Sequence, residues 1–188
     1  MILPRWRRLA CTVLFWLALA PGGLFAEGIQ VRSAELEMDT DGYRLNADFD
    51  ISFTPTLEDA LNKGVALYFV TEFELARPRW YWFDQKVVEL RQQFKLSYNA
   101  LTRQYRLSVG VGTLFQNYAT LEEAVNVMSQ LHNRLVADKD ALQKGQKYAA
   151  ALRMKLDLSL LPKPFQVNAL ASKDWTLSSD WYRWEVTP

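Results

Sequence analysis

Strict alternation of apolar and polar residues is the clearest pattern in the chain. In residues 43–53 every second residue is apolar, and the residues between them are polar. A period of two over eleven residues predicts a strand with one buried and one solvated face. Residues 29–38 alternate as well, with a phase slip near Ser33 and Ala34 that fits a β-bulge. Because the Asp-Thr-Asp-Gly segment at 39–42 joins the two runs, we expect a β-hairpin here.

Further alternating segments predict additional strands. Four long ones are expected at residues 65–75, 88–98, 105–111 and 150–160, and two shorter ones at 165–171 and 175–186. Pro162 and Pro164 should end the strand that precedes them, because proline has no N–H to give to a sheet.

Two segments depart from the period of two and predict helices. Residues 56–64 begin with a threonine that can cap a helix and end with Gly64, which suits the position after a helix. Residues 120–136 place apolar side chains three and four positions apart on one face, and Thr120 with Glu123 fits a capping box.

These elements define the expected fold class. About eight strands carry one apolar and one polar face, as antiparallel sheets with a solvated side do. The regular alternation of strand and helix that marks a parallel sheet is missing. We therefore expect an all-β, mainly antiparallel protein, an immunoglobulin-like β-sandwich with two short helical insertions.

The first 26 residues have the layout of a secretory signal peptide. Three arginines (Arg5, Arg7 and Arg8) precede the apolar run 9–20, and a proline and two glycines then break it. We expect cleavage after Ala26, export to the periplasm, and one β-sandwich domain over 27–188. The alternative is an uncleaved anchor, since residues 9–26 are free of charge, although the uninterrupted apolar part is too short to span a membrane.

Composition and charge narrow the chemistry. The chain of 188 residues has 22 basic and 21 acidic residues, one Cys and one His, and 49% of it is hydrophobic. The net charge of +1 gives no general attraction for nucleic acid. Removal of residues 1–26 takes away three arginines, the cysteine and no acidic residue, so the remainder carries a net charge of −2. No disulfide, Cys/His metal centre or cofactor site is expected.

Two candidate catalytic arrangements are weak. His132 follows Ser129 by three residues on the predicted helix, but no acidic residue is placed to orient the ring, and a surface histidine is the expectation. Four aspartates occur in the first hairpin, at Asp39, Asp41, Asp48 and Asp50. Four carboxylates could bind calcium or provide a glycosidase pair. However, aspartate is common in turns and on solvated strand faces, which accounts for these residues without a site.

Residues 77–84 form the candidate interaction surface. They read Arg-Pro-Arg-Trp-Tyr-Trp-Phe-Asp, four aromatics beside Arg77 and Arg79. If the segment is extended, Trp80 and Trp82 face one way and the other two aromatics face the opposite way. One pair can enter the core, and the other needs a cover, either the 120–136 helix or a partner. A second aromatic cluster in 175–184 is expected to seal the sandwich.

The chain resembles a family of uncharacterised exported proteobacterial proteins, the domain of unknown function 4390. The resemblance rests on Leu57-Glu58-Asp59-Ala60-Leu61, on Arg77-x-Arg79-Trp80-Tyr81-Trp82, and on the later Leu161-Pro162-Lys163-Pro164-Phe165-Gln166. It covers about residues 28–186. It implies an envelope protein of a Gram-negative bacterium, encoded beside a two-component sensor kinase, and it supplies no catalytic residues.

The expected function is therefore non-catalytic. The leading hypothesis is a protein-interaction module of the cell envelope, accessory to a membrane sensor, with Arg77, Arg79, Trp80 and Trp82 as the contact surface and an unknown envelope protein as the partner. The alternative is a periplasmic module that binds a glycan or lipid in a groove with Trp80 or Trp82 on its floor. Neither hypothesis involves binding to nucleic acid. We expect contact with the membrane only through the signal segment, before it is cleaved.

Overall fold

The described residues fold into two antiparallel β-sheets. The computed structural model describes residues 28–188 apart from 80, 82, 83, 111 and 113. The predicted signal segment lies outside that range. The smaller sheet has the strand order β1-β2-β7, and the larger has the order β6-β5-β4-β3-β8-β9. The strands are β1 (Gly28–Met38), β2 (Gly42–Ser52), β3 (Leu67–Arg77), β4 (Gln85–Asn99), β5 (Gln104–Val109), β6 (Gln116–Tyr118), β7 (Gln130–Asp138), β8 (Tyr148–Leu156) and β9 (Tyr182–Val186). The prediction of an all-β antiparallel sandwich is confirmed.

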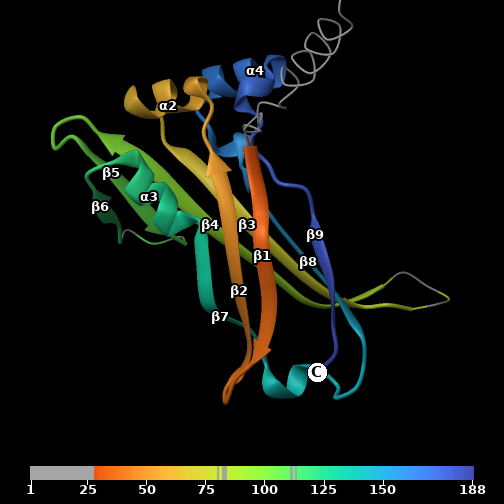
Figure 1. The fold of residues 1–188 in the computed structure, drawn as a ribbon. Coiled ribbons are helices and arrows are strands. Elements are labelled where there is room, and N and C mark those ends of the chain that lie inside the picture. Colours follow the sequence, from red (N-terminus) through yellow and green to blue (C-terminus); the bar gives the residue numbers. More distant parts are fainter. Residues whose placement is uncertain (1–27, 80, 82–83, 111, 113) are drawn as a thin grey trace, which may run out of the picture.

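The three-stranded sheet lies against one face of the six-stranded sheet (Figure 1). Two α-helices, α2 (Pro55–Asn62) and α4 (Lys163–Ala171), cover one end of the sandwich, and α3 (Leu121–Met128) lies beside β5 and β6. Three short 3₁₀ turns, η1 (Lys139–Ala141), η2 (Leu158–Leu160) and η3 (Lys173–Trp175), complete the described elements. Among the described elements, none covers the other face of the six-stranded sheet, and we call it the solvent face.

The core lies between the two sheets. Alternate residues of the strands point inward and are buried, among them Leu45 and Phe49 on β2, Phe69 and Phe73 on β3, and Leu152 on β8. Burial of each such side chain contributes about 1.5–3 kcal/mol. Since the described residues contain no cysteine, this packing holds the sheets together without a disulfide.

The predicted first hairpin is confirmed. Asp39 and Gly42 exchange backbone hydrogen bonds across the turn, 2.8 Å and 3.4 Å long. Gly42 has a φ of +151°, and a Cβ there would overlap the carbonyl oxygen of Ala137 on β7. The position thus needs glycine for the close approach of the third strand. The expected bulge is present between Val31 and Ser33.

The first predicted helix is also confirmed, with a different cap. The Thr54 hydroxyl accepts a hydrogen bond from the Leu57 N–H and donates one of 2.7 Å to the Asp174 carbonyl. Pro55 occupies the first turn, where no N–H is needed. Thr54 therefore caps α2 and joins it to the turn at η3.

The prediction of a helix over 120–136 is wrong in its second half. The Thr120–Glu123 capping box is present, but α3 ends at Met128 and β7 begins at Gln130. The pairing of β7 with β2 shifts between Leu131 and Arg134, and Asn133 has a φ of +57°. This bulge breaks the alternation of β7, so its apolar residues fall at helical spacing.

The C-terminal part differs as well. Residues 165–171, expected as a strand, lie in α4. The prolines stand before and within its first turn, where their missing N–H groups cost nothing, and the Pro162 carbonyl accepts from the Phe165 N–H at 2.9 Å. Of the strand expected at 175–186, only β9 forms an extended pairing with β8, from Tyr182 onward.

Candidate functional site

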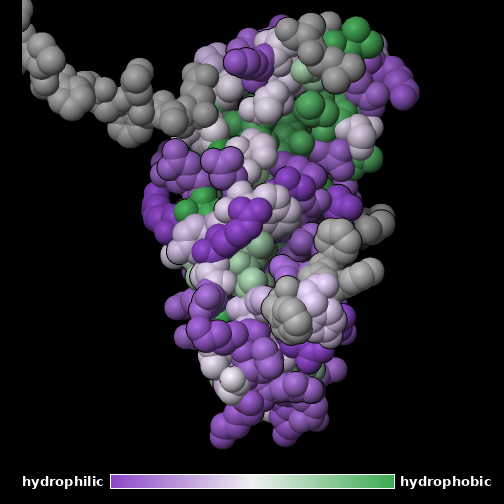
Figure 2. Space-filling model, turned by 90° about the vertical axis from the view of Figure 1, so that its right-hand side faces the viewer, coloured by the Kyte–Doolittle hydropathy of each residue, from purple (hydrophilic) through white to green (hydrophobic). Residues whose placement is uncertain are grey.

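The candidate interaction surface lies at the end of the β3–β4 hairpin. The two strands pair as far as Arg77 and Gln85, and their ends project beyond the sheets on the side opposite α3, β5 and β6 (Figure 1). Figure 2 looks onto that side, where the surface of the lower half is mostly hydrophilic and apolar residues gather at the upper end near α4. Trp80 and Trp82 lie outside the described residues, so their role stays a prediction.

We call residues 77–84, between the paired ends of β3 and β4, the hairpin tip. Two guanidinium groups, those of Arg77 and Arg79, converge at its base. The Arg77 Nη2 donates a hydrogen bond of 2.7 Å to the Gln85 Oε1, and the Arg79 Nη2 donates to the same oxygen. The Arg79 N–H also contacts the Asp84 carboxylate, at 3.4 Å. Among the described residues, neither guanidinium has a carboxylate within ion-pairing distance. Two like charges are thus held close together by a neutral amide.

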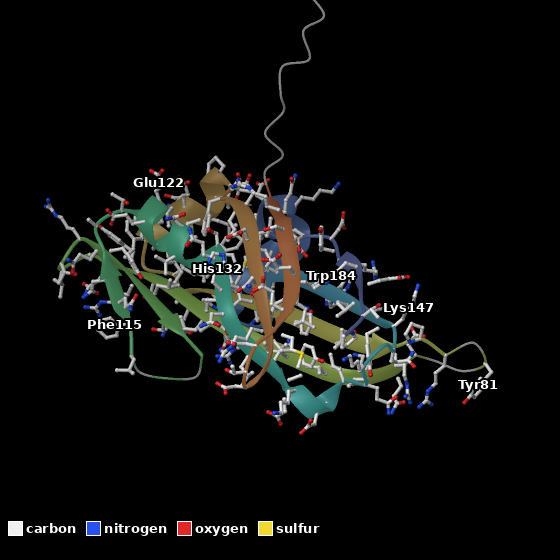
Figure 3. All side chains as sticks on the ribbon, turned by 60° about the horizontal axis from the view of Figure 1, so that its bottom comes forward. Tyr81, Phe115, Glu122, His132, Lys147 and Trp184 are labelled. Carbon is white, nitrogen blue, oxygen red and sulfur yellow. The ribbon has the colours of Figure 1, made fainter. Side chains whose placement is uncertain are left out.

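Tyr81 marks the far end of the hairpin. Its side chain is 65% exposed and lies at the extreme of the molecule in Figure 3. The helix that we considered as an internal cover, α3, contacts β5, β6 and β7 instead. It lies at the other end of the six-stranded sheet, where Figure 3 also places Phe115. The helix therefore lies away from the described ends of β3 and β4 at Arg77 and Gln85.

A second charged cluster lies on the solvent face of the six-stranded sheet. Glu72 on β3 is flanked by Arg91 on β4 and by Arg153 and Lys155 on β8. Its Oε1 lies 3.1 Å from the Arg91 Nη2 and 3.1 Å from the Lys155 Nζ, and its Oε2 lies 2.6 Å from the Arg153 Nη2. Burial raises the pKa of Glu72, but the hydrogen bonds and charges of Arg153 and Lys155 outweigh it, and the pKa lies below its ordinary value of 4.5.

Trp181 extends this cluster. The Arg153 guanidinium carbon lies 4.3 Å from the centroid of the Trp181 ring, a cation–π contact. The C-terminal aromatic cluster therefore has two roles. Trp175 is buried and Trp184 packs on Phe73 at a centroid distance of 6.1 Å, as expected for sealing the core, whereas Trp181 serves the charged face.

The Ser129–His132 pair, which the sequence made a weak candidate, is not formed. His132 lies on β7, not on a helix, and its Nε2 is 2.9 Å from the Asp48 Oδ1 (Figure 3). The Ser129 hydroxyl instead donates to the Asn126 carbonyl at 2.8 Å. The histidine is exposed, as expected, and Asp48 orients its ring. Sequence reasoning missed this carboxylate because it comes from β2.

Three of the four aspartates of the first hairpin have an arginine neighbour, and the fourth, Asp48, contacts His132. Asp39 and Asp41 lie 2.9 Å and 3.5 Å from Arg44, and Asp50 lies 3.0 Å from Arg32. In the part of the chain that the structure describes, no three His, Cys, Asp or Glu residues are grouped so as to hold a metal ion. The arrangement is that of ordinary turn and cross-strand ion pairs.

Two of the grooves that the described residues form lie beside α3. A polar groove of about 570 Å³ runs between β1–β2 and α3, past Arg32, Asp50 and Glu123. An apolar groove of about 290 Å³ lies between the β5–β6 edge and α3, and its walls include Phe115 and Val127. The polar groove already contains the Arg32–Asp50 ion pair, and the apolar one adjoins the edge of the six-stranded sheet.

Within the described ranges, none of the helices combines the length and the apolar character that crossing a bilayer would require.

The fold and these surfaces define an antiparallel two-sheet β-sandwich with one projecting hairpin and a charged outer face. The chain belongs to the family described as Domain of unknown function (DUF4390), whose model matches residues 26–185. The resemblance drawn from the sequence is thereby confirmed over nearly the same span. No curated protein and no solved structure matches the chain.

Proposed function

We propose that the chain is a non-catalytic, exported protein of the cell envelope that binds another envelope protein through the tip of the β3–β4 hairpin. The observation that carries the proposal is the convergence of Arg77 and Arg79 on Gln85 at the end of a projecting hairpin. Export is supported by the signal-like pattern of residues 1–26.

The residue types at the tip are those that dominate binding energy at interfaces. Arginine, tryptophan and tyrosine are enriched among hot-spot residues, and residues 77–84 contain all three. A narrow projecting element reaches into a concave surface, as long binding loops do. We therefore expect the partner to offer a pocket instead of a flat face.

The partner pocket should be acidic. Two guanidiniums without a carboxylate partner among the described residues form charge-assisted hydrogen bonds with an incoming carboxylate, and planar donors favour bidentate contact. Neutralisation of both charges by one acidic cluster would also remove their mutual repulsion.

A non-catalytic role is supported by the fate of the candidate catalytic groups. The Ser129 hydroxyl is bonded to the backbone, and Asp48 is bonded to His132 on an exposed strand face. General acid–base catalysis usually relies on titratable groups that are clustered in a pocket and have strongly shifted pKa values. An exposed strand face does not offer such a pocket, which supports a non-catalytic role.

Capture of partners from envelope extract tests the proposal. The double variant Arg77→Gln, Arg79→Gln should lose the partner retained by the wild-type chain. Arg32→Gln is the matched control, because Arg32 is an exposed arginine on the other sheet and its loss should leave capture unchanged. Equal capture by all three proteins would contradict the proposal.

Export with cleavage is tested by N-terminal sequencing. The sequence of the exported form should begin at Glu27, and retention of Met1 would contradict cleavage.

A further inference from the structure

The solvent face of the six-stranded sheet carries a compact group of cations. Glu72 points to this face, because its neighbours Thr71 and Phe73 point into the core. Arg91 and Arg153 are the cross-strand partners of Glu72, and Lys155 stands two residues beyond Arg153. Lys95, four residues along β4 from Arg91, lies 5.7 Å from the centroid of the Tyr68 ring. We call Arg91, Lys95, Arg153 and Lys155 the basic strip.

The basic strip is not neutralised by its own carboxylate. Glu72 accepts from Arg91, Arg153 and Lys155 together, so one negative charge faces three positive ones. The nearest acidic residues along β3 and β4, Glu74 and Glu89, share one cation, Lys86, and so leave one negative charge. Asp157, whose N–H donates to the Tyr68 carbonyl, adds another beside Lys155. The four cations of the strip still exceed Glu72 and these two neighbouring negative charges by one, and the mutual repulsion of the cations favours the binding of an anion.

The dimensions of the strip suit a linear polyanion. Neighbouring strands are about 4.8 Å apart, so Arg91 and Arg153, which flank β3, stand about 10 Å apart in backbone position. The four residue steps from Arg91 to Lys95 cover about 13 Å at the usual strand rise. Several anionic groups of one extended chain can be contacted across such a distance.

We propose that the basic strip binds an anionic polysaccharide through its carboxylate, sulfate or phosphate groups. Trp181, stacked on Arg153, places an aromatic surface beside the strip, and aromatic rings pack against sugar rings. The proposal is independent of the hairpin tip and assigns a second, separate surface.

A thin polymer fits the strip better than a flat bilayer. The side chains of Arg153 and Lys155 are only 28% and 30% exposed, so their charged groups lie low on the sheet. A flexible chain can follow them, whereas a planar lipid surface touches the most protruding groups first. Because the whole chain is nearly neutral, binding of the polymer has to come from the basic strip itself and not from a general attraction.

Binding of dextran sulfate by the full exported chain, measured by calorimetry at low salt, tests the assignment. Arg91→Gln should weaken binding about three- to fivefold, the loss expected for one exposed charged contact. Adding Lys155→Gln should weaken it further. Arg32→Gln removes an arginine of similar exposure, 69% against 59% for Arg91, and should leave binding unchanged. Uncharged dextran should not bind.

Three results would overturn the inference. They are absence of dextran sulfate binding by the wild-type chain, equal weakening by Arg91→Gln and Arg32→Gln, and Arg91-dependent binding to phosphatidylglycerol vesicles without binding to the polymer. The last would assign the strip to a membrane surface. The Arg77→Gln, Arg79→Gln variant should bind dextran sulfate normally, so failure of the hairpin proposal and failure of this one can be told apart.

Discussion

Arg79 and Gln85 face each other across the end of the β3–β4 hairpin, where the Arg79 Nη2 donates a hydrogen bond to the Gln85 Oε1. Arg77 donates to the same oxygen. One neutral side chain therefore orders two cationic ones, and neither has a carboxylate within ion-pairing distance among the described residues. This relationship makes Gln85 the residue through which the hairpin tip can be tested without deleting an arginine.

Gln85→Glu should suppress partner capture while preserving the fold. The new carboxylate would pair with both guanidiniums within the chain, so they would no longer be available to an acidic partner. The stability should change by less than about 1 kcal/mol, since the site is exposed. Gln85→Ala serves as the control and should keep more capture than Gln85→Glu. The reverse order of the two variants would contradict an acidic partner.

Tyr81→Ala should leave the free energy of unfolding within about 1 kcal/mol of the wild-type value, because the side chain is 65% exposed. Tyr148→Ala is the matched control. Tyr148 is buried, and its hydroxyl accepts a hydrogen bond from the Gln143 N–H, so its truncation should cost about 3–5 kcal/mol. Denaturant unfolding measures both. From the sequence, we expect at least one of Trp80→Ala and Trp82→Ala to leave the free energy of unfolding as little changed as Tyr81→Ala does. A large loss of stability in both variants would indicate that both tryptophans belong to the core.

Glu72 should stabilise the fold in a pH-dependent way. Its pKa in the folded protein is below the ordinary value of 4.5, so its contribution is present above that pH and is lost as the pH falls through the folded pKa. Glu72→Gln should lower the free energy of unfolding by about 1–3 kcal/mol at pH 7. The difference from the wild type should shrink as the pH is lowered below 4.5.

The control for Glu72 is Glu122→Gln, an exposed glutamate in the first turn of α3 (Figure 3), which should lower the free energy of unfolding by less than about 1 kcal/mol. A deficit of Glu72→Gln that is the same at pH 7 and at pH 3 would show that the carboxylate charge does not stabilise the sheet.

Thr71 and Thr54 should respond in opposite ways to replacement by valine. Both are buried, but the Thr71 Oγ1 has no hydrogen-bond partner among the described residues, while the Thr54 hydroxyl bonds to Leu57 and Asp174. Thr71→Val should raise the free energy of unfolding by up to about 1 kcal/mol, and Thr54→Val should lower it by about 1–2 kcal/mol. Destabilisation by Thr71→Val would mean that its hydroxyl is satisfied after all.

Local patterns in the sequence predict much of this fold. The β1–β2 hairpin and the long strands follow from alternation and turn chemistry, because both signals lie within a few consecutive residues. The prediction failed for β7, since the bulge at Asn133 shifts the phase of the side chains. It failed for α4 because prolines mark the start of a helix as well as the end of a strand.

The candidate surfaces, like the fold, have features that the sequence predicts and features that depend on how distant strands pair. The aromatic and basic composition of the hairpin tip is visible in the sequence, but the convergence on Gln85 depends on the register of β3 with β4. The Glu72 cluster is harder to foresee. Its partner Arg153 is 81 residues away along the chain, and only the strand order β4-β3-β8 brings the cations together.

Site-specific photocrosslinking at the hairpin tip tests the central claim most directly. A photoreactive residue placed at Tyr81 in the exported chain should give one discrete adduct with an envelope protein, and the Arg77→Gln, Arg79→Gln changes should abolish that adduct. The same residue placed at Leu101, which is 96% exposed in the turn between β4 and β5, should give none. Absence of an adduct at position 81, or the same adduct from position 101, would contradict the assignment of the hairpin tip as the contact surface.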